Sequence, residues 1–295
     1  GPRQVKEVAF PLVARERGVY RLGPLRVAAG DFFGISTCHL QVPAEETVVV
    51  YPHVRPLPEL GLPSRLSFGS LKALERINPD PARLAGVRGY QAGDPLRTIH
   101  WPATARTQEL QVKQFDHTVT ANCLLLLDLY EGDYPPDHFF PSVERAVSTA
   151  ASLAAHIIQR GEACGLAANA VLSEYWPERT DIVHETGYVQ FQPRQGTQQL
   201  SAILLALAGV QPQNHVDFYS LLAESRKQLR GASILLWVVP EDTPQLLDAA
   251  AGFLREGQRV LIFAVERVLH GELLAAPHGS ALQLFAVSPG GDLPL

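Results

Sequence analysis

Cys123-Leu124-Leu125-Leu126-Leu127-Asp128 is the stretch of sequence that decides the fold. Five consecutive apolar residues are followed at once by an acid. A continuous apolar run of this length is typical of a strand that is buried on both faces, as in a parallel sheet covered by helices. The stretch therefore predicts an α/β domain in which Asp128 stands at the carboxyl end of a strand.

The residues that follow alternate between helical and strand patterns. Pro141-Ser142 opens a long helix with apolar residues at helical spacing, and Gly161 ends it. The expected helices are 143–160, 197–208, 217–230 and 244–256, and the expected strands are 163–170, 188–191, 233–239 and 259–265. Such alternation predicts a parallel sheet with helices on both faces.

Residues 3–60 have a different pattern, with short strands separated by turn residues. Val5–Phe10 partly alternates, Val19–Leu22 begins a second strand, and Thr47–Tyr51 is a β-branched run. Gly-Pro and Gly-Asp turn signals divide these runs. The pattern favours a small antiparallel β module in front of the α/β domain.

Residues 61–118 are expected to be a connector. A short helix is predicted at Ser70–Arg76, and Pro79 and Pro81 prevent it from extending far. The expected organisation is therefore a β module at 3–60, a connector with a signature segment at 61–118, and the α/β domain at 119–295.

The signature segment is residues 88–106, RGYQAGDPLRTIHWPATAR. It resembles the signature of the DUF58 family, whose usual form is R-x-Y-x-x-G-D-x-x-R-x-I-x-W-x-x-[ST]-A-R. Ten positions match in a fixed frame, namely Arg88, Tyr90, Gly93, Asp94, Arg97, Ile99, Trp101, Thr104, Ala105 and Arg106. The resemblance implies a von Willebrand factor A-like domain after the segment, two transmembrane helices before it, and a functional link to a MoxR-type AAA+ ATPase.

The side chains of the segment favour an internal clamp between two modules. Asp94 lies in a turn, the arginines carry planar forks that bind carboxylates, and the aromatic residues supply apolar area. The clamp residues are Arg88, Tyr90, Gly93, Asp94, Arg97, Trp101 and Arg106. Two alternatives remain open: a partner or anionic-ligand surface built on the arginines, and single-stranded nucleic acid stacked on Tyr90 and Trp101.

The resemblance also implies a place for a divalent cation, which such domains hold with Asp-x-Ser-x-Ser, a Thr and a later Asp. Tyr130 and Gly132 replace both serines here, and hard cations need several converging oxygens. We therefore expect no metal and no cofactor. We expect instead a partner-binding rim at the carboxyl ends of the strands, made of Asp128, Tyr130, Glu131, Thr197, Glu241 and Asp242.

Composition narrows the function classes. The net charge of -5 argues against a dedicated nucleic-acid binder. Cys38, Cys123 and Cys164 are far apart and are expected to be reduced. The sequence has no Met and begins Gly1-Pro2, so we expect further residues before Arg3 in the natural protein, including a membrane anchor.

These observations predict a non-enzymatic adaptor or scaffold at the cytoplasmic face of the cell membrane. The expected partner is a protein, and the resemblance points to a MoxR-type AAA+ ATPase. An anionic-ligand or nucleic-acid module using Arg88, Arg97 and Arg106 is the first alternative. A hydrolase using the acidic rim is the second, although no G-x-S-x-G nucleophile motif occurs.

Overall fold

The computed structural model of the chain divides into two units by its contacts. It describes residues 7, 9, 11–31, 33, 35, 37–43, 45–64, 84–91, 94–115, 122–176, 183–185, 187–229, 233–271 and 280–288. Residues 1–66 and 122–295 make up the first unit, and residues 67–121 make up the second. The expected helix at Ser70–Arg76 lies outside the described residues.

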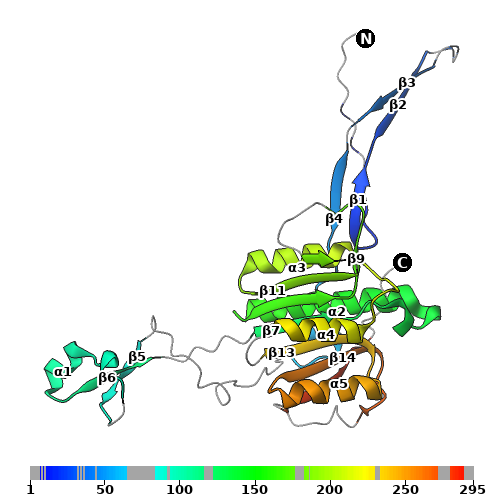
Figure 1. The fold of residues 1–295 in the computed structure, drawn as a ribbon. Coiled ribbons are helices and arrows are strands. Elements are labelled where there is room, and N and C mark those ends of the chain that lie inside the picture. The colour runs from blue at the N-terminus through cyan, green and yellow to red at the C-terminus, as the bar shows by residue number, and fades with distance from the viewer. Residues whose placement is uncertain are drawn as a thin grey trace. The chain divides into compact units, whose positions relative to one another are not determined.

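A mixed sheet forms the centre of the first unit (Figure 1). Within the described residues it has seven strands in the order β10-β11-β8-β7-β13-β14-β15. Neighbours from β8 to β15 pair in parallel, whereas β11 and β10 continue the sheet beyond β8 in antiparallel pairing. The strands are β7 (Asn122–Leu127), β8 (Ala163–Ala168), β10 (Val183–Glu185), β11 (Tyr188–Arg194), β13 (Ser233–Glu241), β14 (Arg259–Arg267) and β15 (Leu282–Ala286).

Helices cover both faces of this sheet. On one face α2 contacts β7, β8, β13 and β14 and packs against α3, while α4 and α5 pack on the other face. The helices are α2 (Phe139–Gln159), α3 (Thr197–Gly209), α4 (Phe218–Gln228) and α5 (Pro244–Arg255). Because successive strand residues point to opposite faces, the leucines of β7 pack against the helices on both faces of the sheet. The expected mixed α/β fold is thereby confirmed.

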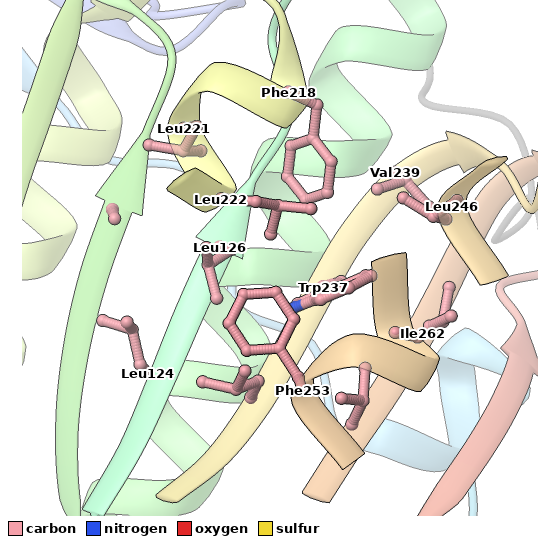
Figure 2. Packing of buried hydrophobic residues seen from close by; sticks show 14 of the residues in the cluster. Leu124, Leu126, Phe218, Leu221, Leu222, Trp237, Val239, Leu246, Phe253 and Ile262 are labelled. Atoms are coloured by element: carbon pink, nitrogen blue, oxygen red, sulfur yellow. The ribbon is translucent and has the colours of Figure 1, made fainter. Parts of the chain in front are cut away.

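Trp237 is the centre of the core beneath α4 and α5 (Figure 2). Its fully buried ring meets Phe218 of α4 and Phe253 of α5 edge-on, with ring centroids 5.8 and 5.6 Å away. Edge-to-face contacts place the positive edge of one ring on the negative face of another. Burial of each surrounding Leu or Phe side chain contributes roughly 1.5–3 kcal/mol, so this cluster fixes both helices on the sheet.

Four strands precede the sheet within the first unit. β1 (Gly18–Leu22) pairs with β4 (Glu46–Val50), and β2 (Leu25–Gly30) pairs with β3 (Thr37–Val42), both antiparallel. Arg17, just before β1, donates from its guanidinium to the carbonyls of Leu207 and Val210 at the end of α3, at 2.9 and 2.8 Å. The same group lies 3.0 Å from Glu144 of α2. A buried cation thus ties β1 to two helices.

Short elements connect the longer ones. They are η1 (Leu57–Leu60), η4 (Glu131–Asp133), η5 (Pro136–His138), β9 (Val171–Leu172) and β12 (Val210–Gln211), and the last two pair with each other.

The second unit contains the signature segment. β5 (Leu84–Gly89) and β6 (Gln111–Phe115) form an antiparallel pair, with η3 (Leu96–Thr98) and α1 (Trp101–Thr107) between them. Ile99 and Val112 are buried and joined by a β-bridge, which gives this unit a small core. His100 caps α1, since its Nδ1 accepts a hydrogen bond from the amide of Ala103 at 3.0 Å.

Two features of the sheet differ from the expectation. The strand that begins at Tyr188 runs antiparallel to β8, and β15 follows the strand expected to be the last. Among the described residues no helix combines the length and apolar character needed to cross a bilayer.

Candidate functional site

Asp128 lies at the carboxyl end of β7, as the sequence predicted, but its carboxyl group is buried and hydrogen-bonded. It is 2% exposed. Its Oδ1 accepts from the side-chain amide of Asn169 at 2.9 Å and from the backbone amide of Tyr130 at 3.1 Å. The Oδ1 of Asn169 accepts in turn from the amide of Leu129 at 2.6 Å. The two side chains thus join the ends of neighbouring strands β7 and β8.

Gln213 extends this network into the loop between α3 and α4. Its Nε2 donates to the carbonyls of Val216 at 2.6 Å and Asn169 at 3.2 Å, and its Oε1 accepts from the amides of His215 and Val216. Its own backbone pairs with Leu129 and Glu131. Asp128, Asn169 and Gln213 form a buried polar network, called here the rim network.

Asn169 and Gln213 were missed by the sequence analysis. Asn169 follows the apolar strand that ends at Ala168, just as Asp128 follows Leu127, and this repetition is a usable signal. Gln213 is 5% exposed in a loop, and its role depends on where that loop lies, which no local pattern reveals.

Two acids at this rim, Asp128 and Asp133, have raised pKa values. Burial raises the pKa of Asp128 well above its usual value, and the neighbouring charge of Asp133 raises it further. Burial also raises the pKa of Asp133, with Asp217 adding to the effect. A cation at Asp128 Oδ1 would have to displace the side-chain amide of Asn169.

The described residues contain no group of three or more His, Cys, Asp or Glu side chains arranged to hold a metal ion. The rim network instead presents donor and acceptor groups that satisfy one another. These hydrogen bonds hold the ends of β7 and β8 to the loop between α3 and α4.

The carboxylate of Asp242 is also used in hydrogen bonds within the fold. It is fully buried after β13 and accepts hydrogen bonds from the amides of Leu269 and His270 at 2.5 and 2.8 Å. His270 Nδ1 lies 3.2 Å from the same carboxylate. Glu241 is half-buried and stands in register with Arg267 of β14. Neither acid joins the hydrogen bonds of the rim network.

Tyr130 and Glu131 give the rim its accessible side chains. Glu131 is exposed, and Tyr130 is half-exposed with its ring lying against Gly132. A bridge between Tyr130 and Gln213 holds this turn to the α3–α4 loop. The bridge and the rim network therefore fix the backbone from which these two side chains extend.

Thr197 does not lie at this rim. Because β11 runs antiparallel, its final residue Arg194 pairs with Cys164 near the start of β8. Gln195 then donates to the carbonyl of Gly161, and Thr197 begins α3 at the same edge of the sheet. Thr197 therefore lies at the end of the sheet where the parallel strands begin, whereas Asp128 lies at the end where they finish. The expectation that Thr197 lies beside Asp128 is corrected.

In the second unit, Arg88 and Asp94 form a two-pronged ion pair. The guanidinium nitrogens lie 2.7 and 2.8 Å from the carboxylate oxygens, and the amide of Gln91 also donates to Asp94. These contacts hold the pKa of Asp94 below its usual value. Tyr90 is half-buried and its amide donates to Leu110, so this part of the signature closes the turn after β5. Gly93 lies outside the described residues.

Arg97, Trp101 and Arg106 face solvent instead. Trp101 is 66% exposed and neighbouring Leu96 is 70% exposed. Arg97 and Arg106 are exposed, and neither has a hydrogen-bond or ion-pair partner within the described part of the chain. The single internal clamp expected from the sequence is therefore divided: Arg88 and Asp94 pair with each other, whereas Arg106 contacts no buried carboxylate among the residues that the structure describes.

Comparison with known proteins gives the family. The family model described as "Protein of unknown function DUF58" matches residues 86–266, which include the signature segment and most of the sheet. The chain is also similar to the "Uncharacterized protein YeaD" of Bacillus subtilis (strain 168), with 26% identity over 161 residues, 54% of this chain and 38% of that protein. The match thus spans well under half the length of this curated relative. Because the family model covers more than half of the 295 residues, the chain belongs to the DUF58 family.

Proposed function

We propose that this protein is a non-enzymatic adaptor that binds another protein through the signature segment of its second unit. The observation that carries the proposal is the exposure of Leu96, Arg97, Trp101 and Arg106, called here the signature surface. Trp and Arg are enriched at the centres of protein interfaces because they combine large contact area with directed hydrogen bonding. An exposed Trp and two exposed guanidinium groups, which have no partner among the described residues, fit a binding partner with apolar and acidic side chains.

The turn beneath this surface supports the proposal. The Arg88–Asp94 pair fixes the turn after β5, and His100 caps the helix that begins with Trp101. Side chains displayed on a fixed backbone lose less conformational entropy when they bind. Arg88 is neutralised by Asp94, whereas Arg97 and Arg106 have no ion-pair partner among the described residues and are available to a binding partner.

The rim network supports a binding role over catalysis. Asp128 and Asp242, the acids best placed for chemistry, already use their oxygens on Asn169 and on backbone amides. A general base needs a carboxylate within reach of a substrate proton. We propose that the α/β unit is a von Willebrand factor A-like domain whose cation site has been replaced by this network, with Tyr130 and Glu131 as a secondary contact surface.

The partner that we propose is a MoxR-type AAA+ ATPase, at the cytoplasmic face of a membrane to which residues outside this chain tether the protein. The family resemblance supplies this identity, and the signature surface supplies the chemistry that the ATPase must match. The partner surface should be acidic and partly apolar.

Binding of the purified chain to a purified MoxR-type ATPase by biolayer interferometry tests this proposal. Trp101→Ala and Arg97→Glu/Arg106→Glu should each weaken binding at least about tenfold, the scale of interface hot spots. Arg194→Glu is the matched control, since Arg194 is exposed on β11 and has no ion-pair partner in the described residues. Equal affinity for all four proteins would contradict the proposal.

A second candidate uses the same side chains to bind an anionic ligand, with single-stranded nucleic acid as the specific case. The exposed indole of Trp101 favours it, because bases stack on aromatic rings and phosphates pair with Arg. Fluorescence anisotropy with a labelled single-stranded oligonucleotide distinguishes the two. Strongly salt-dependent binding that Trp101→Ala abolishes, without ATPase binding, would favour the nucleic acid.

A further inference from the structure

The hydrogen bond that caps the start of α1 depends on an unprotonated nitrogen of His100. His100 is the N-cap of this helix, and its Nδ1 accepts from the backbone amide of Ala103 at 3.0 Å. A neutral imidazole has one donating and one accepting nitrogen, whereas the imidazolium has two donors. Because Nδ1 accepts here, the proton of the neutral ring lies on Nε2, and the cap exists only while His100 is neutral.

Protonation of His100 turns this contact into a repulsion. The second proton binds at Nδ1, where it faces the amide hydrogen of Ala103. It also adds a positive charge beside the amides of the first helical turn, which carry partial positive charge themselves. The amide of Ala103 keeps its bond to the carbonyl of His100, at 3.1 Å, but the ring has to rotate away. The helix thereby loses its side-chain cap.

The helix α1 is short enough for one cap to matter. It has 7 residues, and a short helix is marginal because few hydrogen bonds offset the cost of ordering its first turn. None of its residues is buried, so packing contributes little to holding it. Its other end closes at Gln108 with φ 57°, a conformation that favours glycine. The cap at His100 is therefore a substantial part of what keeps α1 formed.

The surroundings of His100 give an imidazolium no carboxylate partner. The ring lies between η3 and α1, and the backbone amide of His100 donates to Gln111 of β6 at 2.7 Å. The charged side chains on these three elements are cations, namely Arg97, Arg106 and Lys113. The acids of the adjoining turns are Asp94, which pairs with Arg88, and Glu109, and neither bonds to His100 among the described residues. No ion pair therefore compensates for the lost cap.

We propose that His100 makes the signature surface sensitive to protons. Near neutral pH the capped helix displays Trp101 and Arg106, its first residue and a residue of its last turn, in fixed positions. In mildly acidic solution the cap is released and both side chains lose this fixed backbone, since imidazole changes its charge between about pH 5 and about pH 8. The effect on binding rests on the proposed function, whereas the release of the cap does not.

Hydrogen exchange of the α1 amides in the 295-residue chain, corrected for the intrinsic effect of pH on exchange, tests the release of the cap. Between about pH 7.5 and about pH 5.5 the protection of residues 104–108 should fall about fivefold, the scale of a lost N-cap. His100→Asn should stay protected at both pH values, because Asn caps helices with an oxygen that does not titrate. His100→Ala should be poorly protected at both.

His138→Asn is the matched control for this experiment. His138 precedes α2, but its side chain makes no cap hydrogen bond, so this variant should behave like the unmodified chain. Circular dichroism of all the variants shows whether the fold is retained. Equal protection of the unmodified chain at both pH values, or an unchanged pH dependence in His100→Asn, overturns the inference.

Binding to a purified MoxR-type ATPase separates this inference from the proposed function. At the lower pH the affinity of the unmodified chain should fall by up to about fivefold relative to His100→Asn, since fewer molecules have the helix formed. Comparing the two proteins cancels any effect of pH on the ATPase. A constant ratio, with the cap released by hydrogen exchange, would contradict the proposed function and leave the proton-sensitive cap standing. Without release by hydrogen exchange the inference fails, whatever the binding shows.

Discussion

The side chain of Asn169 donates to Asp128 Oδ1 across 2.9 Å, joining the carboxyl ends of two neighbouring parallel strands. Asn169 is fully buried and also donates to Val216 in the α3–α4 loop. Asn169→Ala removes the donor and leaves Asp128 Oδ1 and the amide of Leu129 with fewer partners. We expect a loss of about 2–3 kcal/mol in the free energy of unfolding. Urea denaturation measures it, and Asn214→Ala, an exposed residue of the same loop, should change little.

Stability should fall as the pH rises through the titration of Asp128. Since its pKa is raised in the folded state, the fold binds a proton that the unfolded chain has released, and the free energy of unfolding decreases between the unfolded and the folded pKa. The effect is absent at lower pH, where both states are protonated. Asp128→Asn imitates the protonated group and should flatten the profile above the unfolded pKa of an aspartate, about pH 4. Urea unfolding from acidic to mildly alkaline pH provides the test, and a parallel profile for the variant would count against a raised pKa at Asp128.

Arg17→Met should destabilise the first unit. The Arg17 side chain is only 7% exposed and satisfies carbonyls at the end of α3 while pairing with Glu144. Met keeps the apolar stem but leaves Glu144 and the helix end unpaired, at a cost of roughly 2–4 kcal/mol. Thermal unfolding by calorimetry should show this, whereas Arg15→Met, at an exposed position, should unfold like the unmodified chain. Equal melting temperatures would mean that Arg17 contributes no net stability.

Arg106→Ala should leave stability almost unchanged. Arg106 is exposed and has no ion-pair partner in the described residues, so the change should stay within about 0.5 kcal/mol. Chemical denaturation monitored by circular dichroism measures the difference. A loss of several kcal/mol would restore the internal clamp that the sequence suggested.

Gly165→Ala should disrupt the contact between β8 and β11. A Cβ at this position would lie 2.7 Å from the carbonyl oxygen of Phe191 and 2.9 Å from the nitrogen of Pro193, both backbone atoms that cannot rotate away. The pairing of β8 with β11 is irregular here, which brings the two chains close. We expect a cost of about 1–3 kcal/mol, measured by urea unfolding. Gly271→Ala, with open space around the Cβ position, should have a much smaller effect.

The sequence predicted the central strands and the long helix well, because burial leaves a direct mark on residue pattern. The strand that ends at Leu127 and the helix α2 could be predicted from their apolar residues alone, without knowledge of their neighbours in the fold. The direction of β11 was not predicted, although its alternation between buried Val189 and Phe191 and their less buried neighbours is typical of an antiparallel edge region. β15 was missed because it is a short strand after a long connection.

The candidate site shows the same division. The position of Asp128 follows from its place after a buried strand, and the exposed signature side chains follow from no local rule. Thr197 was assigned to the wrong edge because the direction of one strand decides at which end of the sheet the next helix begins. Hydrogen bonds between distant segments, such as those of Gln213, depend on the complete fold.

The attachment of Arg17 also determines how mechanical tension would pass through the molecule. A pull on β1 reaches the helices through a guanidinium held by the last carbonyls of α3 and by Glu144. A pull on β4 reaches α2 through the backbone amide of Arg55, which donates to Ser152. We expect these isolated contacts to break before the central strands, whose parallel ladders distribute the force over many hydrogen bonds. Stretching the protein in an optical trap should therefore release the amino-terminal strands first while the sheet stays folded.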